Sequence, residues 1–445
     1  MTSSSLPPKV AILHNDSSPK TPAASPPEGS PAGAARPGAR PELGASLRST
    51  ATIRERCKNI LRAVEEGRSR HFTLNRSQLD EVARRVEHVT RQNYPSLRIP
   101  YHSRWRHFEA GGVDRKAALD AQLAGRDAAA QARARIDLTL VSVLLDAGAG
   151  PAWRYAEAES GQAFSRSEGL GVASFRSFMQ GRFSSDAADP LRVDAEALRQ
   201  IDAAELAQVF QLRSDNPLVG LDGRLALLQR LGSAMRAQPE VFGSDGRPGG
   251  LFDALTQQGQ LDRLPAPRVL QALLDHLSAI WLTGNQLQGM PLGDCWQHPL
   301  AGGTGLTAGW VPFHKLSQWL TYSLLEPFEW AGITLTEIDG LTGLPEYRNG
   351  GLLLDARVIV PKDPTFASRS YTAADEAIIE WRALTVALLD EVAPLVRERL
   401  SRSAEEMPLA RILEGGTWAA GREIAKSLRE GGSPPLRIES DGTVF

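Results

Sequence analysis

The chain has 445 residues, of which 42% are hydrophobic and 23% are charged, and its formal net charge is −2. This near balance of charges excludes bulk electrostatic attraction as the main way of binding nucleic acid or an anionic membrane, so we expect neither as a partner. Its two cysteines, Cys57 and Cys295, are too few for a disulfide framework or a cysteine-based zinc cage.

Residues 1–46 are rich in proline, alanine, serine and glycine, as in the run S-P-P-E-G-S-P-A-G-A-A-R-P at residues 25–37. Such a composition buries too little apolar surface to offset the entropy lost on ordering. We therefore predict a disordered tail over residues 1–46, in which the short apolar run Val10–Leu13 is a candidate for local docking.

Apolar residues at helical spacing predict a series of helices after this tail. They cover about 53–64, 79–89, one long helix over 115–146, then 194–212, 221–237 and 266–290, and a last helix over 417–429. A helix that begins at Phe313 is expected to be interrupted or to end near Pro327. Thr372 is the expected N-cap of a helix that runs to about Leu400, with a kink at Pro394.

Strand signals are few. Residues 341–355 read as a turn-rich loop, and Leu352–Leu354 is expected to pair with Val358–Val360 in a small β-hairpin. Because strands and helices do not alternate, a doubly wound sheet is excluded and a mostly α, multi-helix globular enzyme domain is predicted. We expect a single catalytic unit over 47–432, with lobes 47–265 and 266–432 as an alternative division, and a loose C-terminal tail over 433–445.

No apolar run reaches the roughly 18 residues of a membrane-spanning helix. The N-terminus also lacks the basic and apolar regions of a secretory signal, and we therefore expect a cytoplasmic protein.

The helix from Phe313 carries polar residues at intervals of four. His314, Gln318 and Tyr322 share one face, opposite a face of leucines. A polar stripe of this kind either lines a cleft or lies in solvent, and we predict that it lines a cleft.

Carboxylates gather shortly after this helix. Asp339 and Glu346 are followed at once by Tyr347, Arg348 and Asn349. Hydrolysis needs a carboxylate to activate water or to stabilise a developing cation, and an arginine can hold a carboxylate or a phosphate. The alternative is that Asp339 caps a turn and that Glu346 and Arg348 form a structural pair.

Cations and aromatic rings alternate in the segment Tyr101–Phe108. The guanidinium groups of Arg104 and Arg106, with His102 and His107, predict a pocket for an anion or phosphate. In the alternative interpretation, the aromatic residues of the segment anchor it in the core and its arginines lie on the surface.

Asp294-Cys295-Trp296-Gln297-His298 contains a Cys-x-x-His spacing. Structural zinc needs four ligands, so we expect no metal here, and Asp294 either caps a helix or touches substrate. The sequence also lacks a Walker A loop, GxSxG, HExxH and a dinucleotide fingerprint, and no cofactor is expected. Glu380 and Arg382, on either side of Trp381, are expected to form an ion-pair scaffold beneath the site.

Three long segments, at residues 100–115, 311–324 and 341–352, resemble a fungal and bacterial uracil-catabolism family that was long described as a domain of unknown function. The resemblance covers residues 47–432. It implies a place in the ring-opening route of uracil degradation, in which a ribosyl-urea arises and urea is released. It also implies association with other enzymes of that route.

A more distant resemblance concerns three short motifs in the same order. Phe313-His314-Lys315 with Gln318, Glu346-Tyr347-Arg348 and Glu380-Trp381-Arg382-Ala383 are similar to F-Y-K-R-A-Q, D-Y-R-V-P and E-I-R-A of the queuosine-salvage N-glycosidases. That resemblance implies a helical fold related to DNA glycosylases and cleavage of a ribosyl C–N bond. This chain differs by Glu346 for aspartate, Asn349-Gly350 for V-P, and Ser323 where the family has an aspartate.

The combined hypothesis is a hydrolase that releases urea from a ribosyl-urea or its 5′-phosphate. The predicted catalytic residues are Glu346, Asp339 and His314. The predicted substrate-binding residues are Tyr101, His102, Arg104, Arg106, Asp294, Gln318, Tyr347, Arg348 and Asn349. The alternatives are an amidohydrolase that acts on an acyclic ureido intermediate, or a non-catalytic partner of other enzymes in the pathway.

Overall fold

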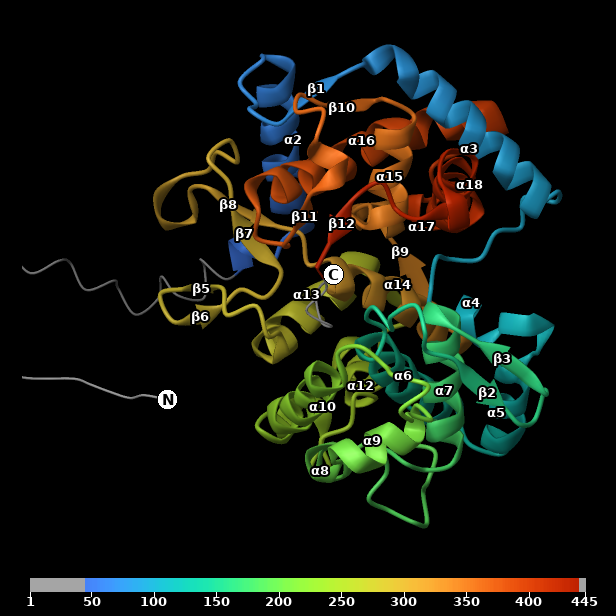
Figure 1. Cartoon of the computed structure of the whole chain (residues 1–445). Coiled ribbons are helices and arrows are strands. Elements are labelled where there is room, and N and C mark those ends of the chain that lie inside the picture. Colours follow the sequence, from blue (N-terminus) through green and yellow to red (C-terminus); the bar gives the residue numbers. More distant parts are fainter. Residues whose placement is uncertain (1–44, 440–445) are drawn as a thin grey trace, which may run out of the picture. The chain divides into compact units, whose positions relative to one another are not determined.

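The computed structural model describes residues 45–439, and helices make up most of this part (Figure 1). The tail predicted over 1–46, including Val10–Leu13, lies outside the described residues except for its last two positions. The helices are α2 (Thr50–Glu65), α3 (Leu79–Asn93), α4 (Trp105–Phe108), α5 (Arg115–Leu123), α6 (Ala128–Leu144), α7 (Arg166–Met179), α8 (Ala195–Gln200), α9 (Ala203–Val209), α10 (Leu221–Arg236), α11 (Pro239–Phe242), α12 (Gly250–Thr256), α13 (Ala266–Leu277), α14 (Lys315–Trp330), α15 (Tyr347–Asp355), α16 (Glu376–Leu400), α17 (Leu409–Ile412) and α18 (Trp418–Leu428). The predicted mostly α class is confirmed.

The described strands are two or three residues long and form separate two-stranded pairs. The antiparallel pairs are β1 (Phe72–Leu74) with β10 (Ile359–Pro361), β2 (Tyr155–Glu157) with β3 (Gln162–Phe164), β5 (Gln286–Leu287) with β6 (Met290–Pro291), and β7 (Cys295–Gln297) with β8 (Trp310–Pro312). The parallel pairs are β4 (Arg263–Pro265) with β9 (Thr334–Thr336), and β11 (Ser370–Tyr371) with β12 (Arg437–Ile438).

The prediction of a loop and a hairpin over residues 341–360 is wrong in part. The hairpin is absent from the described chain, because Leu352–Leu354 belong to α15 and β10 pairs with the distant β1. A run of three leucines fits a helix or a strand equally well, and here Glu346 decides the outcome by capping the N-terminus of a helix.

The long helix predicted over 115–146 is two helices. Gly125, between α5 and α6, has a φ of +89°, in the left-handed region that ends a helix. Asp127 then caps α6 by accepting a hydrogen bond from the backbone N of Ala130 at 2.7 Å.

Helices α14 and α16 lie at the centre of the fold. Every residue of α14 from Leu316 to Phe328 is buried, and α14 packs against α6 and α13. Helix α16 packs against α2 and α3. Both helices continue through an internal proline, so α14 extends past Pro327 to Trp330 instead of ending there.

Two features of the last third of the chain differ from the predictions: the N-cap of α16 and the structure of the segment after residue 432. The N-cap residue of α16 is Asp375 and not Thr372, whose backbone N and Oγ1 both donate to the Asp375 carboxylate. The segment expected to be loose after residue 432 adds β12 beside β11, and the backbone N of Glu439 donates to Tyr371 O at 2.8 Å.

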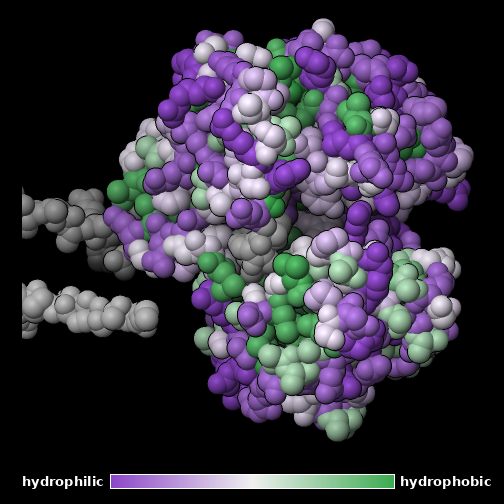
Figure 2. Space-filling model, in the orientation of Figure 1, coloured by the Kyte–Doolittle hydropathy of each residue, from purple (hydrophilic) through white to green (hydrophobic). Residues whose placement is uncertain are grey.

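The main hydrophobic core of the described chain extends from Ile53 in α2 to Leu436, and a small second cluster contains Leu47 and Cys295. The face shown in Figure 2 is mainly hydrophilic, with hydrophobic residues in small separate areas. None of the helices within residues 45–439 has both the length and the apolar character needed to cross a lipid bilayer.

Gly350 gives a test of how closely α15 is packed. A Cβ atom at this position would lie 2.3 Å from Cζ2 of Trp381, whereas one at Gly351 would lie 3.1 Å from the nearest atom of Pro435. We expect Gly350→Ala to lower the free energy of unfolding by about 1–3 kcal/mol through overpacking. Gly351→Ala is the matched control and should change it little, and guanidinium unfolding measures both. Equal effects of the two substitutions would contradict the packing.

Candidate functional site

Glu346 stands at the N-terminus of α15. Its carboxylate accepts hydrogen bonds from the backbone N–H groups of Asn349 at 2.6 Å and Arg348 at 2.8 Å. Burial raises the pKa of Glu346, while these two N–H groups and the nearby charges of Lys315 and His102 oppose that rise. A partly buried carboxylate is therefore held in a fixed place with limited access to water.

Lys315, the first residue of α14, carries the opposite charge within electrostatic reach of Glu346. Burial lowers the pKa of Lys315 to about 8, and Arg382 adds to this effect, whereas Asp294, Glu346 and Asp146 oppose it. Lys315 was not among the predicted site residues. The signal in the sequence is a lone lysine within a helix that is otherwise almost entirely apolar or uncharged.

Asp294 fixes the start of α14. It forms two hydrogen bonds with Arg382, at 2.8 and 2.7 Å, and accepts others from Trp296 Nε1 at 2.7 Å and from the backbone N of Lys315 at 2.9 Å. Burial alone would raise the pKa of Asp294, but Arg382 and the other donors outweigh it and lower this pKa to about 2. The Asp294 carboxylate, predicted to touch substrate, is thus engaged by protein donors.

The predicted polar stripe of α14 is largely bonded within the core. His314 precedes the helix with a φ of +48°, and its Nε2 lies 2.9 Å from Leu47 O, which assigns the ring proton to Nε2. Burial lowers the pKa of His314, so the ring is neutral at pH 7. Gln318 Nε2 donates to Thr342 Oγ1 at 2.8 Å, and Tyr322 donates to Thr342 O at 2.7 Å.

Asp339, the second predicted carboxylate, joins two other elements. Its Oδ1 accepts from the backbone N of Leu409 at 2.6 Å and its Oδ2 pairs with Arg397 at 2.5 Å. One oxygen therefore binds α17 and the other binds α16, which gives Asp339 a structural role.

The residues after Glu346 divide into packed and accessible ones. Arg348 is buried, donates to Gly432 O at 2.9 Å and lies over the rings of Tyr347 and Trp418. Asn349 donates to Leu344 O at 3.1 Å, and its Oδ1 accepts from Thr417 at 2.8 Å. Tyr347 is 38% exposed and is the accessible side chain beside Glu346.

Most of the predicted anion pocket at Tyr101–Phe108 already faces carboxylates. Tyr101 donates to Glu329 at 2.8 Å, and His102 Nδ1 lies 2.8 Å from Glu414. Arg106 pairs with Glu326 at 2.9 Å and with Glu109 at 2.8 Å. These three side chains therefore tie the segment to the rest of the fold.

Arg104, in the same segment, also pairs with a carboxylate, that of Asp146. Its backbone N donates to Ser323 Oγ at 2.9 Å, and its guanidinium group is fully buried 5.7 Å from the centre of the Trp319 ring. Lys315, Trp319 and Ser323 follow one another at intervals of four and lie along one face of α14. Segment 101–108 thus contacts this face at Ser323 and Trp319, and Lys315 at its start lies within electrostatic reach of Glu346. We call these two residues the Lys315–Glu346 centre.

The Cys-x-x-His segment serves the core. Cys295 is buried in a small cluster with Leu47, and His298 Nε2 lies 3.4 Å from the Glu380 carboxylate. Glu380 also accepts from Ser69, so Glu380 and Arg382 have separate partners. Within residues 45–439, no group of three His, Cys, Asp or Glu side chains is placed to hold a metal ion.

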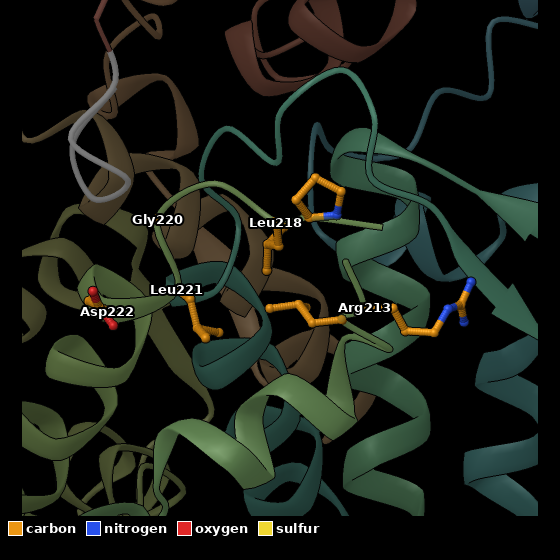
Figure 3. Close-up of a pocket in the computed structure, with 7 residues that line it drawn as sticks. Arg213, Leu218, Gly220, Leu221 and Asp222 are labelled. Carbon is orange, nitrogen blue, oxygen red and sulfur yellow. The ribbon is translucent and has the colours of Figure 1, made fainter. Parts of the chain in front are cut away.

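Two surface pockets lie among residues that the sequence did not single out. The larger, of about 550 Å³, has Arg213 and Asp222 on opposite sides of Leu218 and Leu221 in the close-up (Figure 3). The smaller, of about 360 Å³, includes Arg133 and Phe242. Neither lining includes a predicted site residue.

The sequence matches one protein family and two named proteins over most of its length. The model of a family described as "Protein of unknown function (DUF1688)" matches residues 46–445. The chain is 39% identical over 433 residues to "Uracil catabolism protein 4" of Lachancea kluyveri, an alignment that covers 90% of this chain and 98% of that protein. It is 37% identical over 412 residues to "Protein urg3" of Schizosaccharomyces pombe, covering 91% of this chain and 99% of that protein.

The Asp294–Arg382 pair predicts a specific pH dependence of stability. The folded pKa of Asp294, about 2, lies below the value of ~3.9 of an unfolded chain, so its stabilisation is present above pH ~4 and is lost as the pH falls toward 2. We expect Asp294→Asn to lower the free energy of unfolding by about 3–5 kcal/mol at pH 7 and by less at pH ~3, measured by urea unfolding.

The control for this test is Asp275→Asn, which removes an ion pair with Arg48 in which the Asp275 side chain is 41% exposed. Exposed pairs contribute only about 0–1 kcal/mol, so the effect of this variant should be small at both pH values. An Asp294→Asn deficit of equal size at pH 7 and pH 3 would contradict the depressed pKa.

Proposed function

The chain belongs to the DUF1688 family, and from this premise we propose that it acts in uracil catabolism, the process that the name of its Lachancea kluyveri relative states for that protein. We propose further that it is a hydrolase of the C–N bond between ribose and urea, in a ribosyl-urea or its 5′-phosphate. The products are urea and the free sugar or sugar phosphate. The observation that carries the proposed reaction is that Glu346 and Lys315, at the starts of α15 and α14, are both shielded from water and lie within electrostatic reach of each other.

Hydrolysis of such a bond has two requirements. Positive charge develops at C1′ as the C–N bond breaks, and the leaving nitrogen needs a proton because a urea anion is a poor leaving group. A carboxylate and an ammonium group next to each other, both shielded from bulk water, meet these requirements together.

Glu346 fits the role of the carboxylate. Its two backbone hydrogen bonds fix its position, and in the ionised form it stabilises the cation at C1′ and orients the water that attacks there. The water adds its oxygen to C1′ and gives a proton to Glu346.

Lys315 fits the role of the acid. With a pKa of about 8 it is protonated at pH 7, yet it releases a proton more readily than an exposed lysine does. The electron pair of the broken bond stays on the urea nitrogen, which takes the proton from Lys315 Nζ. In this scheme Lys315 replaces His314 and Asp294, whose polar atoms are bonded to Leu47 and Arg382.

The direct test is incubation of the purified protein with ribosyl-urea and with its 5′-phosphate, followed by assays of urea and free sugar. We expect Glu346→Gln to lower kcat by about 100-fold or more, as expected for loss of a catalytic carboxylate. The matched control is Asp339→Asn, which removes a carboxylate with a structural role and should lower stability more than kcat.

Other products would point to the alternative functions. Ammonia without free sugar would indicate an amidohydrolase. No turnover, together with co-purification of other pathway enzymes, would indicate a non-catalytic partner. Urea release that is unchanged in Glu346→Gln would contradict the assignment of the carboxylate.

The pH profile tests the role of Lys315. Because the acid must be protonated, kcat/KM should fall as the pH rises through about 8, and protonation of Glu346 should give the acid limb. In Lys315→Arg, whose guanidinium stays charged, the alkaline limb should disappear from the range up to pH ~10 while kcat falls. An alkaline limb that stays near pH 8 in this variant would assign it to another group.

A further inference from the structure

The ion pair between Arg104 and Asp146 is incomplete. Nη1 of Arg104 lies 3.1 Å from Oδ2 of Asp146, while Nη2 and Oδ1 have no hydrogen-bond partner among residues 45–439. The side chains are 0% and 7% exposed. Buried polar atoms are nearly always hydrogen-bonded, and each unpartnered one costs about 1–3 kcal/mol. One donor and one acceptor are thus left open on the same ion pair.

Two further polar atoms are unpartnered at the same place. Trp319 Nε1 and His107 Nδ1 are buried without a partner in the described part of the chain. The ring of Trp319 lies beside the Arg104 guanidinium and edge-on to His107, with 5.7 Å between the ring centres. Burial, with Arg104 next, holds the pKa of His107 well below its usual value, so this ring is neutral.

The surrounding chain holds this arrangement in place. Arg104 Nε donates to Ser142 at 2.6 Å and Nη1 donates to Ser167 O at 3.2 Å. Arg224 holds the loop around Asp146 by donating to Leu145 O at 2.9 Å and to Ala147 O at 2.7 Å. These bonds fix the Arg104 side chain and the backbone on both sides of Asp146, and the pair makes one close contact instead of the two-bond geometry that arginine and carboxylate usually adopt.

Helix α7 restricts the same site from another side. A Cβ atom at Gly171 would lie 2.9 Å from Cβ of His107 and 3.4 Å from Cζ of Arg104. The close approach of α7 keeps the guanidinium group against Trp319.

The charges at this place do not favour an anion. Asp146 neutralises Arg104, and Glu168 adds a second negative charge that acts on Arg104. A phosphate offers only acceptors and would face the Asp146 carboxylate. A donor beside an acceptor instead matches a ligand edge with a C=O group next to an N–H group, as in an amide or a urea.

This subsite adjoins the Lys315–Glu346 centre. Trp319 follows Lys315 by one turn of α14, and Asp146 is among the charges that act on Lys315. A ligand that reaches from Glu346 along this face of α14 would therefore place its far end near Arg104 and Asp146.

We propose that Arg104, Asp146 and Trp319 form the subsite for the ureido group of the substrate. The urea oxygen accepts from Arg104 Nη2 and Trp319 Nε1, and the terminal NH₂ group donates to Asp146 Oδ1. This assignment rests on the proposed function, since it places the leaving group of that reaction, and it gives Arg104 a role other than phosphate binding.

The test compares two ligands by calorimetry: N-ribosylurea, and its analogue with two methyl groups on the terminal nitrogen. The analogue keeps the carbonyl and lacks the donors. The full chain with Glu346→Gln is used, so that no ligand is consumed. We expect the analogue to bind on the order of 10- to 100-fold more weakly, because it leaves a buried carboxylate unpaired. Inorganic phosphate should not compete with N-ribosylurea.

Further substitutions in the Glu346→Gln background show which residue discriminates between the two ligands. In Asp146→Asn the amide oxygen is held by Arg104, which turns the NH₂ group toward the ligand, so the preference between the two ligands should fall below about threefold. Asp146→Ala, which has no acceptor, should lose it as well. The matched control, Glu168→Gln, removes a neighbouring negative charge but no predicted contact and should keep the preference.

Several outcomes would overturn the subsite. These are equal binding of the two ligands, a preference that survives in both Asp146 variants, competition by phosphate, or no binding of N-ribosylurea. The result of the urea-release assay is independent of the result of this binding test. If the protein discriminates between the two ligands but releases no urea, the subsite is supported and the proposed function is contradicted. If urea release depends on Glu346 but the ligands are not discriminated, the proposed function is supported and the subsite is contradicted.

Discussion

The buried pair of Asp294 and Arg382 is the interaction on which the rest of the site depends. It connects the residue before β7, the start of α14 and the first third of α16, and the same carboxylate accepts a hydrogen bond from the backbone N of Lys315. Burying two charges is unfavourable unless their hydrogen bonds are satisfied, and here Trp296 and Phe313 surround the pair with a donor and an aromatic face. The position of Lys315 is therefore set by a contact between segments that are 88 residues apart.

The two central residues of the site stand at helix N-termini, and this has opposite consequences for them. The helix dipole favours a negative charge at the start of α15, where Glu346 lies, and disfavours a positive charge at the start of α14, where Lys315 lies. Burial makes both charged forms less favourable. Lys315 thus becomes a stronger acid than a surface lysine, and Glu346 is held in place by the backbone donors that also help to keep it ionised.

Local patterns predicted much of the fold, and long-range contacts decided the site. Periodicity located helices such as α10 and α18, and the rule for helix caps applies to Glu346. The sequence could not show that the polar atoms of His314 are used by Leu47, or those of Asp339 by Arg397, because those partners are remote. Asp146 carried no signal at all, since a lone aspartate after a helix looks like a surface residue until its partner is known.

Ser323 has a structural role at the position where the N-glycosidase motifs have an aspartate. Where that family has an aspartate, Ser323 accepts from the backbone N of Arg104 and donates to Trp319 O at 2.8 Å, so its role is to hold segment 101–108 against α14. A carboxylate at position 323 would have no hydrogen to donate to the Trp319 carbonyl. The guanidinium group of Arg104 binds a carboxylate from another segment, that of Asp146 after α6. In this fold the carboxylate that binds Arg104 is therefore supplied by the segment after α6 and not by α14.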